Sequence, residues 1–189
     1  IAKEEDDQFF AGDGTVWTGV INNANANQVA LGAGEDFAND ITTAKLRAVL
    51  TATPHASRRA GKWFMNTGAF DVIAEMKDGS GNYIFPALQN GTSNRLMGKD
   101  IVLTDSLDDG STATAGAKIL FFGDLKKSAI YGDKGGMRIK MSDEATIRNV
   151  ADDADINLFE DDMSAVRVVR RVGYVLALPT AITVLKNGA

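Results

Sequence analysis

Residues 60–86, AGKWFMNTGAFDVIAEMKDGSGNYIFP, are the stretch around which we predict the rest of the chain to fold. The apolar run WFM at residues 63–65 lies between Gly61 and Asn66, which predicts a short buried strand. Either Asn66 or Thr67 can then cap a helix, because a side-chain oxygen there can accept hydrogen bonds from the first-turn N–H groups. The stretch therefore predicts a strand that leads directly into a helix.

The same stretch predicts how that helix packs and ends. Its apolar positions recur at helical spacing: Phe70, Ile73, Ala74 and Met76. The two glycines of KDGSGN, residues 77–82, permit positive φ angles and end the helix. The β-prone run YIF at residues 83–85 predicts a second strand, which Pro86 closes. No reactive group lies inside this unit, so we interpret it as a packing unit.

Composition bounds the class of protein. Of 189 residues, 44% are hydrophobic and 24% charged, which suits a globular core. The formal net charge of -5 does not favour nucleic-acid binding, because phosphate neutralisation needs Lys and Arg. The chain has no cysteine, so it has neither a disulfide framework nor a thiolate metal site. It shows no signal peptide and no apolar run long enough for a membrane helix, and its start at Ile1 leads us to expect a fragment.

Local patterns along the rest of the chain predict a mixture of short strands and a few helices. We expect helices at residues 1–10 and from a cap at Asp36 or Asp40 to Pro54, with one further helical turn capped by Ser142 or Asp143. Extended runs are expected at residues 16–21, 101–103, 118–122, 129–131, 137–141, 166–171, 174–178 and 181–185. Irregular connections are expected at residues 22–34, 89–94, 104–116 and 149–162. The predicted fold class is α+β.

The sequence offers little catalytic chemistry. His55 is the only histidine, so no two-histidine metal motif exists, and we expect it to be an exposed turn residue. Acidic clusters at residues 4–7, 152–155 and 160–162 could hold a hard cation, but none has calcium-loop spacing and solvated surfaces explain them better. The glycines at residues 12–19 and 32–34 do not match a dinucleotide fingerprint. We predict no catalytic residue, no cofactor and no metal.

Three arginines require an explanation. Arg167, Arg170 and Arg171 lie in a segment flanked by valines. In a strand, Arg167 and Arg171 would share one face and Arg170 would lie on the other. One interpretation is a half-exposed strand with charged outer residues. The other is a subunit interface, since Arg forms bidentate pairs with carboxylates and the chain has carboxylates in excess.

The order of these landmarks resembles the C-terminal half of the major capsid protein family of tailed bacteriophages, whose fold is shared with encapsulins. The matching pieces are FFAGDGT at residues 9–15, GKWFMN at 61–66, MKDGSGNYIF at 76–85, LMGKDI at 96–101, ILFFGDL at 119–125, YGDKGG at 131–136 and the stretch 159–179. Within the last stretch, family positions are held by Asp162, Arg167, Arg171, Gly173 and Pro179. No piece is specific alone, but seven in the same order carry the resemblance.

The resemblance implies a phage major capsid protein fold with two lobes. An axial domain, with a central sheet flanked by helices, would comprise residues 20–141 and a final strand at 177–189. Residues 1–19 would hold the end of a spine helix and the start of the axial domain, and residues 142–176 the strands of a peripheral domain. The loop at residues 104–116 would lie near the axis of a capsomer.

The resemblance also implies a structural function without catalysis. The chain would be a fragment of a bacteriophage or prophage head protein that self-assembles into hexamers and pentamers of an icosahedral shell. The shell would enclose DNA without binding it specifically, involve no membrane, and assemble in the cytoplasm of the host bacterium before residing in the virion capsid. Two alternatives stay open: an encapsulin-like compartment shell, and a small cation-dependent α/β enzyme.

Overall fold

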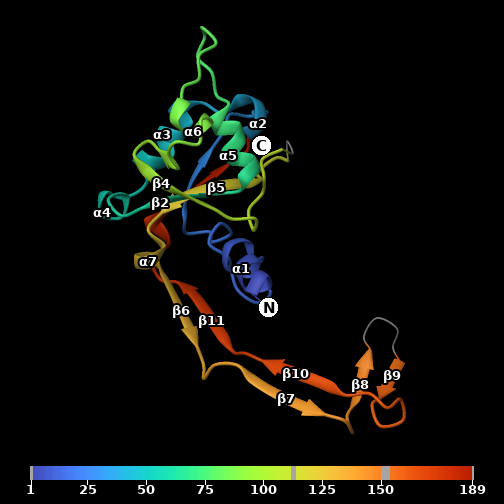
Figure 1. The fold of residues 1–189 in the computed structure, drawn as a ribbon. Helices are drawn as coiled ribbons and strands as arrows, with labels where there is room; N and C mark the ends of the chain where they lie inside the picture. Colours follow the sequence, from blue (N-terminus) through green and yellow to red (C-terminus); the bar gives the residue numbers. More distant parts are fainter. Residues whose placement is uncertain (1, 112–113, 150–153, 189) are drawn as a thin grey trace. The chain divides into compact units, whose positions relative to one another are not determined.

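The structure is a computed structural model that describes residues 2–111, 114–149 and 154–188. Contacts divide it into two compact units (Figure 1). The main unit comprises Ile1–Ile130 and Tyr174–Ala189, and the small unit comprises Tyr131–Gly173. We describe each unit by itself.

A six-stranded mixed sheet forms the centre of the main unit, with the order β1-β12-β5-β2-β4-β3 (Figure 1). Its strands are β1 (Asn27–Ala30), β2 (Lys62–Met65), β3 (Arg95–Leu96), β4 (Lys99–Leu103), β5 (Lys118–Gly123) and β12 (Ile182–Lys186). β5 is antiparallel to both β12 and β2, whereas β4 is parallel to β2 and β1 is parallel to β12. The predicted strands at residues 63–65, 101–103, 118–122 and 181–185 are confirmed.

Alternating side chains of these strands build one core on each face of the sheet. Trp63 and Phe122, which are paired across β2 and β5, belong to the first core, with ring centroids 4.9 Å apart. Phe64 and Phe121, the next pair along the strands, belong to the second core and stack at 4.6 Å. Because successive residues of a strand point to opposite faces, one apolar run fills two cores.

Helices cover the first core. They are α2 (Phe37–Asp40), α3 (Thr43–Ala52), α5 (Thr67–Ala74) and α6 (Pro86–Gln89), whose buried residues include Phe37, Leu46, Val49, Ile73 and Leu88. Asn66 caps α5 as predicted, since its side chain accepts from the Gly68 N–H at 3.2 Å. Where one helix was predicted up to Pro54, two form, because Asp36 caps α2 and Thr42 separately caps α3. Two short helices, α4 (His55–Arg58) and α7 (Leu125–Ser128), complete the main unit.

The second core holds the end of α1 (Ala2–Ala11), in agreement with the predicted first helix. Phe9 packs on Tyr174 with ring centroids 4.5 Å apart, and burial raises the pKa of the Tyr174 phenol to about 12. The predicted extended run at residues 16–21 is wrong. The backbone folds back onto the end of α1 instead, and the Val20 N–H donates a hydrogen bond to the Phe9 carbonyl at 3.0 Å. A side chain at Gly19 would meet the backbone of Gly12, which explains why glycine stands there.

Two further predictions in the main unit are wrong. Residues 83–85 form no strand beyond a single bridge from Tyr83 to Lys77, because Pro86 begins α6, a position that suits its fixed φ. The expected connection at residues 22–34 contains β1. The side-chain amide of Asn27, the first residue of β1, donates a hydrogen bond to the Thr180 carbonyl at 2.8 Å. Its strand geometry comes from pairing with the distant β12, which local propensity cannot reveal.

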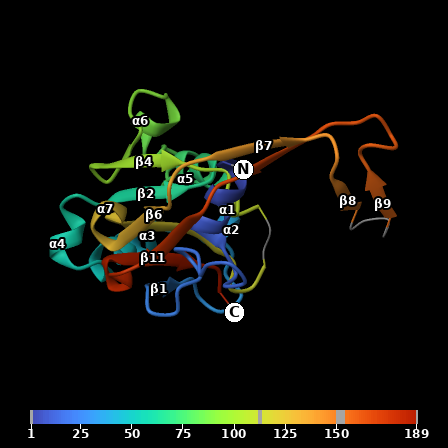
Figure 2. The same cartoon turned by 90° about the horizontal axis from the view of Figure 1, so that it is seen from below.

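The small unit consists largely of paired strands. β7 (Arg138–Ser142) pairs antiparallel with β10 (Ala165–Val169), and we call this pair the β7–β10 ladder. β8 (Thr146–Asn149) pairs antiparallel with β9 (Ala154–Asn157), and Figure 2 shows this second pair beyond the end of β7. The helical turn predicted at Ser142 or Asp143 is therefore wrong, since bends lead directly into β8. The irregular segment predicted at residues 149–162 contains β9, although residues 150–153 lie outside the described residues.

The boundary between the two units falls inside β6 (Ala129–Asp133) and β11 (Val172–Leu176), which pair with each other. The expected extended runs at residues 129–131 and 174–178 thus correspond to strands, and a short 3₁₀ turn, η1 (Pro179–Ala181), precedes β12. The axial domain expected at residues 20–141 includes β7, which the contacts group with the small unit. The domain bounds stay a prediction. Of the expected loop at 104–116, the described residues form no helix or strand.

We expect Phe121→Ala to lower the free energy of unfolding by about 3–5 kcal/mol, because it empties a fully buried, stacked position. Urea titration followed by tryptophan fluorescence measures the change. The matched control is Phe159→Ala, since Phe159 is 77% exposed and its truncation should change stability by less than about 0.5 kcal/mol. Equal losses in both variants would contradict the assignment of the second core.

Candidate subunit interface

The three arginines singled out in the sequence lie in β10 and just after it. Arg167 is the central residue of β10, and Arg170 and Arg171 connect β10 to β11. All three residues are exposed or half-exposed. As predicted from strand alternation, Arg167 and Arg171 point to one side of the ladder.

Arg170 is held within its own chain. Its Nη2 and Nε atoms lie 3.0 and 3.2 Å from Oδ2 of Asp133, at the end of β6. The backbone of Arg171 accepts a hydrogen bond from the Lys134 N–H at 2.9 Å. Together these bonds hold the start of the β6–β7 connection against the β10–β11 connection. The structure therefore separates Arg170, which makes an internal ion pair, from the other two arginines.

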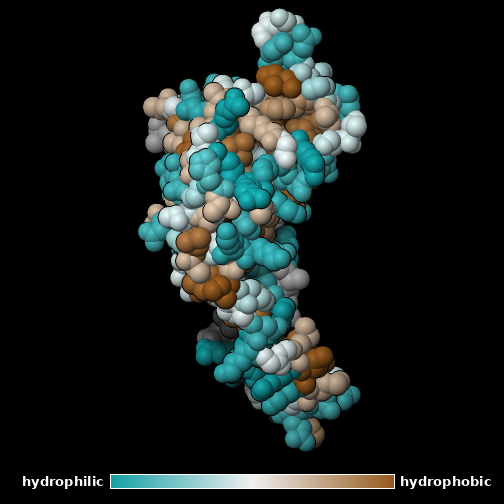
Figure 3. Space-filling model, turned by 90° about the vertical axis from the view of Figure 1, so that its left-hand side faces the viewer, coloured by the Kyte–Doolittle hydropathy of each residue, from teal (hydrophilic) through white to brown (hydrophobic). Residues whose placement is uncertain are grey.

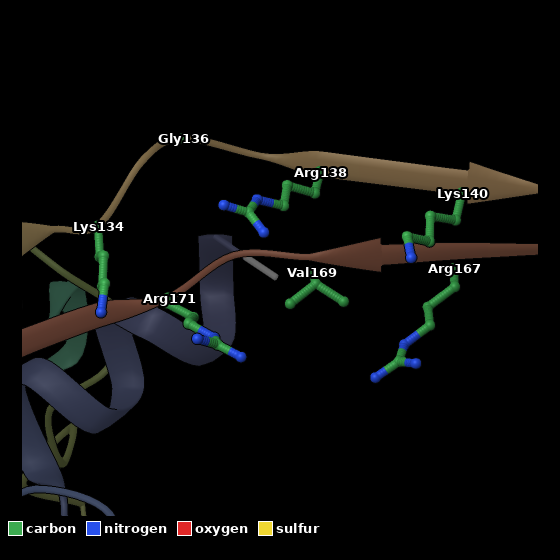
Figure 4. A pocket seen from close by; sticks show the side chains of 7 residues that line it. All are labelled: Lys134, Gly136, Arg138, Lys140, Arg167, Val169 and Arg171. Carbon is green, nitrogen blue, oxygen red and sulfur yellow. The ribbon is translucent and has the colours of Figure 1, made fainter.

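Five cations share the side of the ladder to which Arg167 and Arg171 point, and we call it the cationic face. Its charged residues are Lys134, Arg138, Lys140, Arg167 and Arg171, which surround a hollow of about 180 Å³ (Figure 4). In the part of the chain that the structure describes, none of these five side chains forms an ion pair. The face is thus positively charged in a chain whose net charge is -5.

The register of the ladder places like charges opposite each other. Arg167 pairs with Lys140 across the strands, and Arg138 lies opposite Val169. Directly opposed like charges destabilise a strand pair, so this arrangement costs the isolated chain stability. An anionic partner on the cationic face would remove that cost.

The other side of the ladder is apolar, and we call it the apolar face. Val166 lies opposite Met141, and Val168 lies opposite Ile139. These four side chains are exposed, Met141 by 73% and Ile139 by 63%. Figure 3 shows apolar side chains at several places on the molecular surface, as is usual for folded proteins. On the β7–β10 ladder the apolar side chains lie on one side and the charged side chains on the other.

Neither face of the ladder is covered by another described residue of the small unit. A two-stranded ribbon is marginally stable alone in water, because it has no interior in which to bury apolar side chains. Contiguous exposed apolar residues on a folded surface typically mark an interaction site. The described side chains of this site offer positive charge on one face and apolar area on the other, and both suit a contact with another molecule.

The other candidate residues of the sequence do not assemble into a reactive site. His55 is exposed at the start of α4, as expected for a turn residue. Within residues 2–111, 114–149 and 154–188, no three His, Cys, Asp or Glu side chains are placed to hold a metal ion. Residues 152 and 153 of one acidic cluster lie outside these ranges. None of the described helices is long and apolar enough to span a membrane.

Sequence reasoning singled out Arg167 and Arg171 but not Lys134, Arg138 and Lys140, which line the same hollow. A signal was present, because Arg138, Ile139, Lys140 and Met141 alternate charged and apolar residues just as residues 166–168 do. Two strands with the same alternation can form a ladder with one charged and one apolar face. The missing information was their pairing, since Ser142 and its partner Ala165 lie 23 positions apart in the sequence.

Comparisons with known proteins identify the family and the fold of the chain. The model of the phage capsid family matches residues 1–187. A search of curated proteins returns no significant match. Among solved structures, the chain is similar to one from the capsid of an empty GTA particle computed with C5 symmetry, with 24% identity and a TM-score of 0.75. The match covers 100% of this chain but 62% of that one.

Chains from two phages show the same fold. The chain from Mycobacterium phage Adephagia has 18% identity and a TM-score of 0.64, over 100% of this chain and 62% of that one. The chain from Microbacterium phage Oxtober96 has 21% identity and a TM-score of 0.68, over 98% and 61%. The expected capsid fold, with a sheet and flanking helices, is thereby confirmed, and this chain spans less than two thirds of each of these three chains.

We expect Arg167→Glu to stabilise the ladder of the isolated chain by about 0.2–1 kcal/mol, because it replaces a like-charge pair with an attractive one opposite Lys140. Hydrogen exchange of the β7 and β10 amides measures the gain. Arg167→Gln, which removes the repulsion alone, should gain less. The difference should shrink at high salt, where exposed charges are screened. Equal protection in the two variants would contradict the register.

Proposed function

The chain belongs to the phage capsid family, whose model matches residues 1–187, and from that premise we propose that it is a structural subunit of a bacteriophage or prophage head. The family match is the observation that carries the proposal. The subunit would assemble with further copies into hexamers and pentamers of a closed icosahedral shell. The family and the fold favour a structural role over catalysis.

The small unit supports this function in physical terms. A shell subunit needs surfaces that stay open in the monomer and become covered when copies associate. The cationic and apolar faces of the β7–β10 ladder would suit such a contact, since their side chains are exposed within the described residues. We therefore propose Arg167 and Arg171 as contact residues between subunits. Arg170 supports them by holding the end of the ladder to Asp133.

The net charge bears on what the shell encloses. A subunit with a net charge of -5 repels DNA on average, so packaged DNA would be enclosed without specific binding. Location in the virion capsid and assembly in the host cytoplasm follow from the same proposal. No cofactor and no membrane take part in it.

Electron microscopy of the full-length protein tests the proposal. We expect closed shells or ring-shaped capsomers, and a protein that stays monomeric at the concentrations of a producing cell would overturn it.

We further expect Arg167→Glu combined with Arg171→Glu to reduce shell yield at least tenfold, because anionic partners would then be repelled from the cationic face. The matched control reverses two exposed lysines elsewhere, Lys126→Glu and Lys127→Glu on α7, which should assemble normally. Sedimentation through a sucrose gradient measures the yield, and circular dichroism verifies that each variant is folded. Equal yields for the two double variants would contradict the assignment of Arg167 and Arg171.

A further inference from the structure

Two residues that follow β12 hold neighbouring segments of the main unit together, and we call Asn187 and Gly188 the latch. Asn187 is 2% exposed, and its Oδ1 atom accepts a hydrogen bond from the Phe37 N–H at 3.0 Å. Its Nδ2 atom donates to the Thr114 carbonyl at 3.3 Å, and its backbone N–H donates to the Ala117 carbonyl at 2.9 Å. The latch thereby joins the start of α2 to the chain that leads into β5.

Gly188 completes the latch through its backbone. Its N–H donates to the Glu35 carbonyl at 3.1 Å, and its carbonyl accepts from the Gly116 N–H at 3.3 Å. A side chain at position 188 would collide with the Gly32 carbonyl, so glycine alone fits this close approach. The residue before it must be an asparagine, because one carboxamide group there both accepts and donates a hydrogen bond. The packing of the fold therefore requires the dipeptide Asn-Gly at this place.

An Asn-Gly dipeptide is chemically labile, since glycine has no side chain to hinder attack on the asparagine carboxamide. The backbone nitrogen of the glycine forms a bond to Cγ of the asparagine. Ammonia leaves with the Nδ2 atom and the proton of that backbone N–H, and a succinimide ring remains. Water then opens the ring to aspartate or to isoaspartate, whose backbone runs through the former side chain. The reaction needs no reagent other than water.

The closed latch opposes this reaction in three ways. The attacking atom is the Gly188 nitrogen, whose proton is engaged by the Glu35 carbonyl. The carboxamide of Asn187 is held by its bonds to Phe37 and Thr114, so it turns toward the Gly188 nitrogen only when both bonds break. Burial of Asn187 also excludes the water that would open a succinimide.

We propose that Asn187 is a deamidation site guarded by the fold, protected while the latch is closed and reactive when the latch opens. The contacts that guard it are buried within the main unit, so the inference does not depend on which further segments or copies cover the surface. It goes beyond the proposed function and does not rest on it.

Deamidation would prevent the latch from closing again. In an aspartate at position 187, an oxygen replaces Nδ2 and faces the Thr114 carbonyl oxygen, so a buried hydrogen bond is lost and a charge takes its place. An isoaspartate would lengthen the backbone just after β12 and displace the N–H that donates to the Ala117 carbonyl. A chain that stays open is therefore altered permanently, whereas a chain that closes promptly is not.

Peptide mass spectrometry of the full-length protein tests the protection. The folded protein and a synthetic peptide of residues 182–189 are incubated in the same mildly alkaline buffer, and deamidation at residue 187 is followed over time. We expect the reaction to be at least tenfold slower in the folded protein than in the peptide. Equal rates would overturn the proposal and would leave the shell function untouched.

A pair of variants tests whether the latch is the guard. Glu35→Ala removes the carboxylate that accepts from the Gly32 N–H at 2.6 Å, which loosens the turn that carries the Glu35 carbonyl and leaves the reacting dipeptide unchanged. We expect deamidation at residue 187 to become at least threefold faster. The matched control is Glu75→Ala, which truncates an exposed glutamate at the end of α5 and should leave the rate unchanged. The same rate in both variants would show that the latch does not guard the site.

The variant Asn187→Asp tests whether the product keeps the latch open. We expect hydrogen exchange of the Gly116 and Gly188 amides to become at least tenfold faster. Asn90→Asp makes the same change at the other Asn-Gly dipeptide, which is exposed at the end of α6, and should leave that exchange unchanged. Unchanged exchange in Asn187→Asp would overturn the permanence of the alteration, while the comparison of deamidation rates does not require this variant to fold.

Discussion

A ladder of two strands has two faces and no interior, and this constraint shapes the small unit. In the main unit, β2 and β5 are covered on both sides, so Trp63 and Phe64 each find a core. In the β7–β10 ladder the same alternation sends Met141 to one side and Lys140 to the other, and nothing described within the unit covers either. The same pattern therefore stabilises the chain in one place and leaves binding surfaces open in the other.

The sequence correctly predicted the helices and strands that depend on interactions between residues close together in the chain. Asn66 as a helix cap, the buried run at residues 63–65 and the strand at residues 118–122 follow from short-range rules that the structure confirms. The failures share a different cause. β1 and β9 are strands because of the strands they pair with, β12 and β8, and a single sequence does not contain that pairing. The strand predicted at residues 83–85 failed for another reason: a proline can either end a strand or begin a helix, and Pro86 begins α6.

The candidate interface was half predictable for the same reason. Alternation alone places Arg167 and Arg171 on one side of a strand. What alternation cannot give is the register, which puts Lys140 directly opposite Arg167 and Met141 opposite Val166. The register turns two ordinary strands into a charged face and an apolar face. The fold also gives Arg170, adjacent in sequence, a different role through its ion pair with Asp133.

The energies explain why small contacts between copies suit a repeated assembly. Burying one large apolar side chain contributes about 1.5–3 kcal/mol, and exposed ion pairs such as those that Arg167 could form add at most about 1 kcal/mol each. Bringing two molecules together costs about 4–15 kcal/mol. A single small contact between two copies therefore does not outweigh this cost and stays reversible. When a ring closes, its last subunit makes two contacts for one loss of freedom, so closed assemblies become stable while isolated pairs do not.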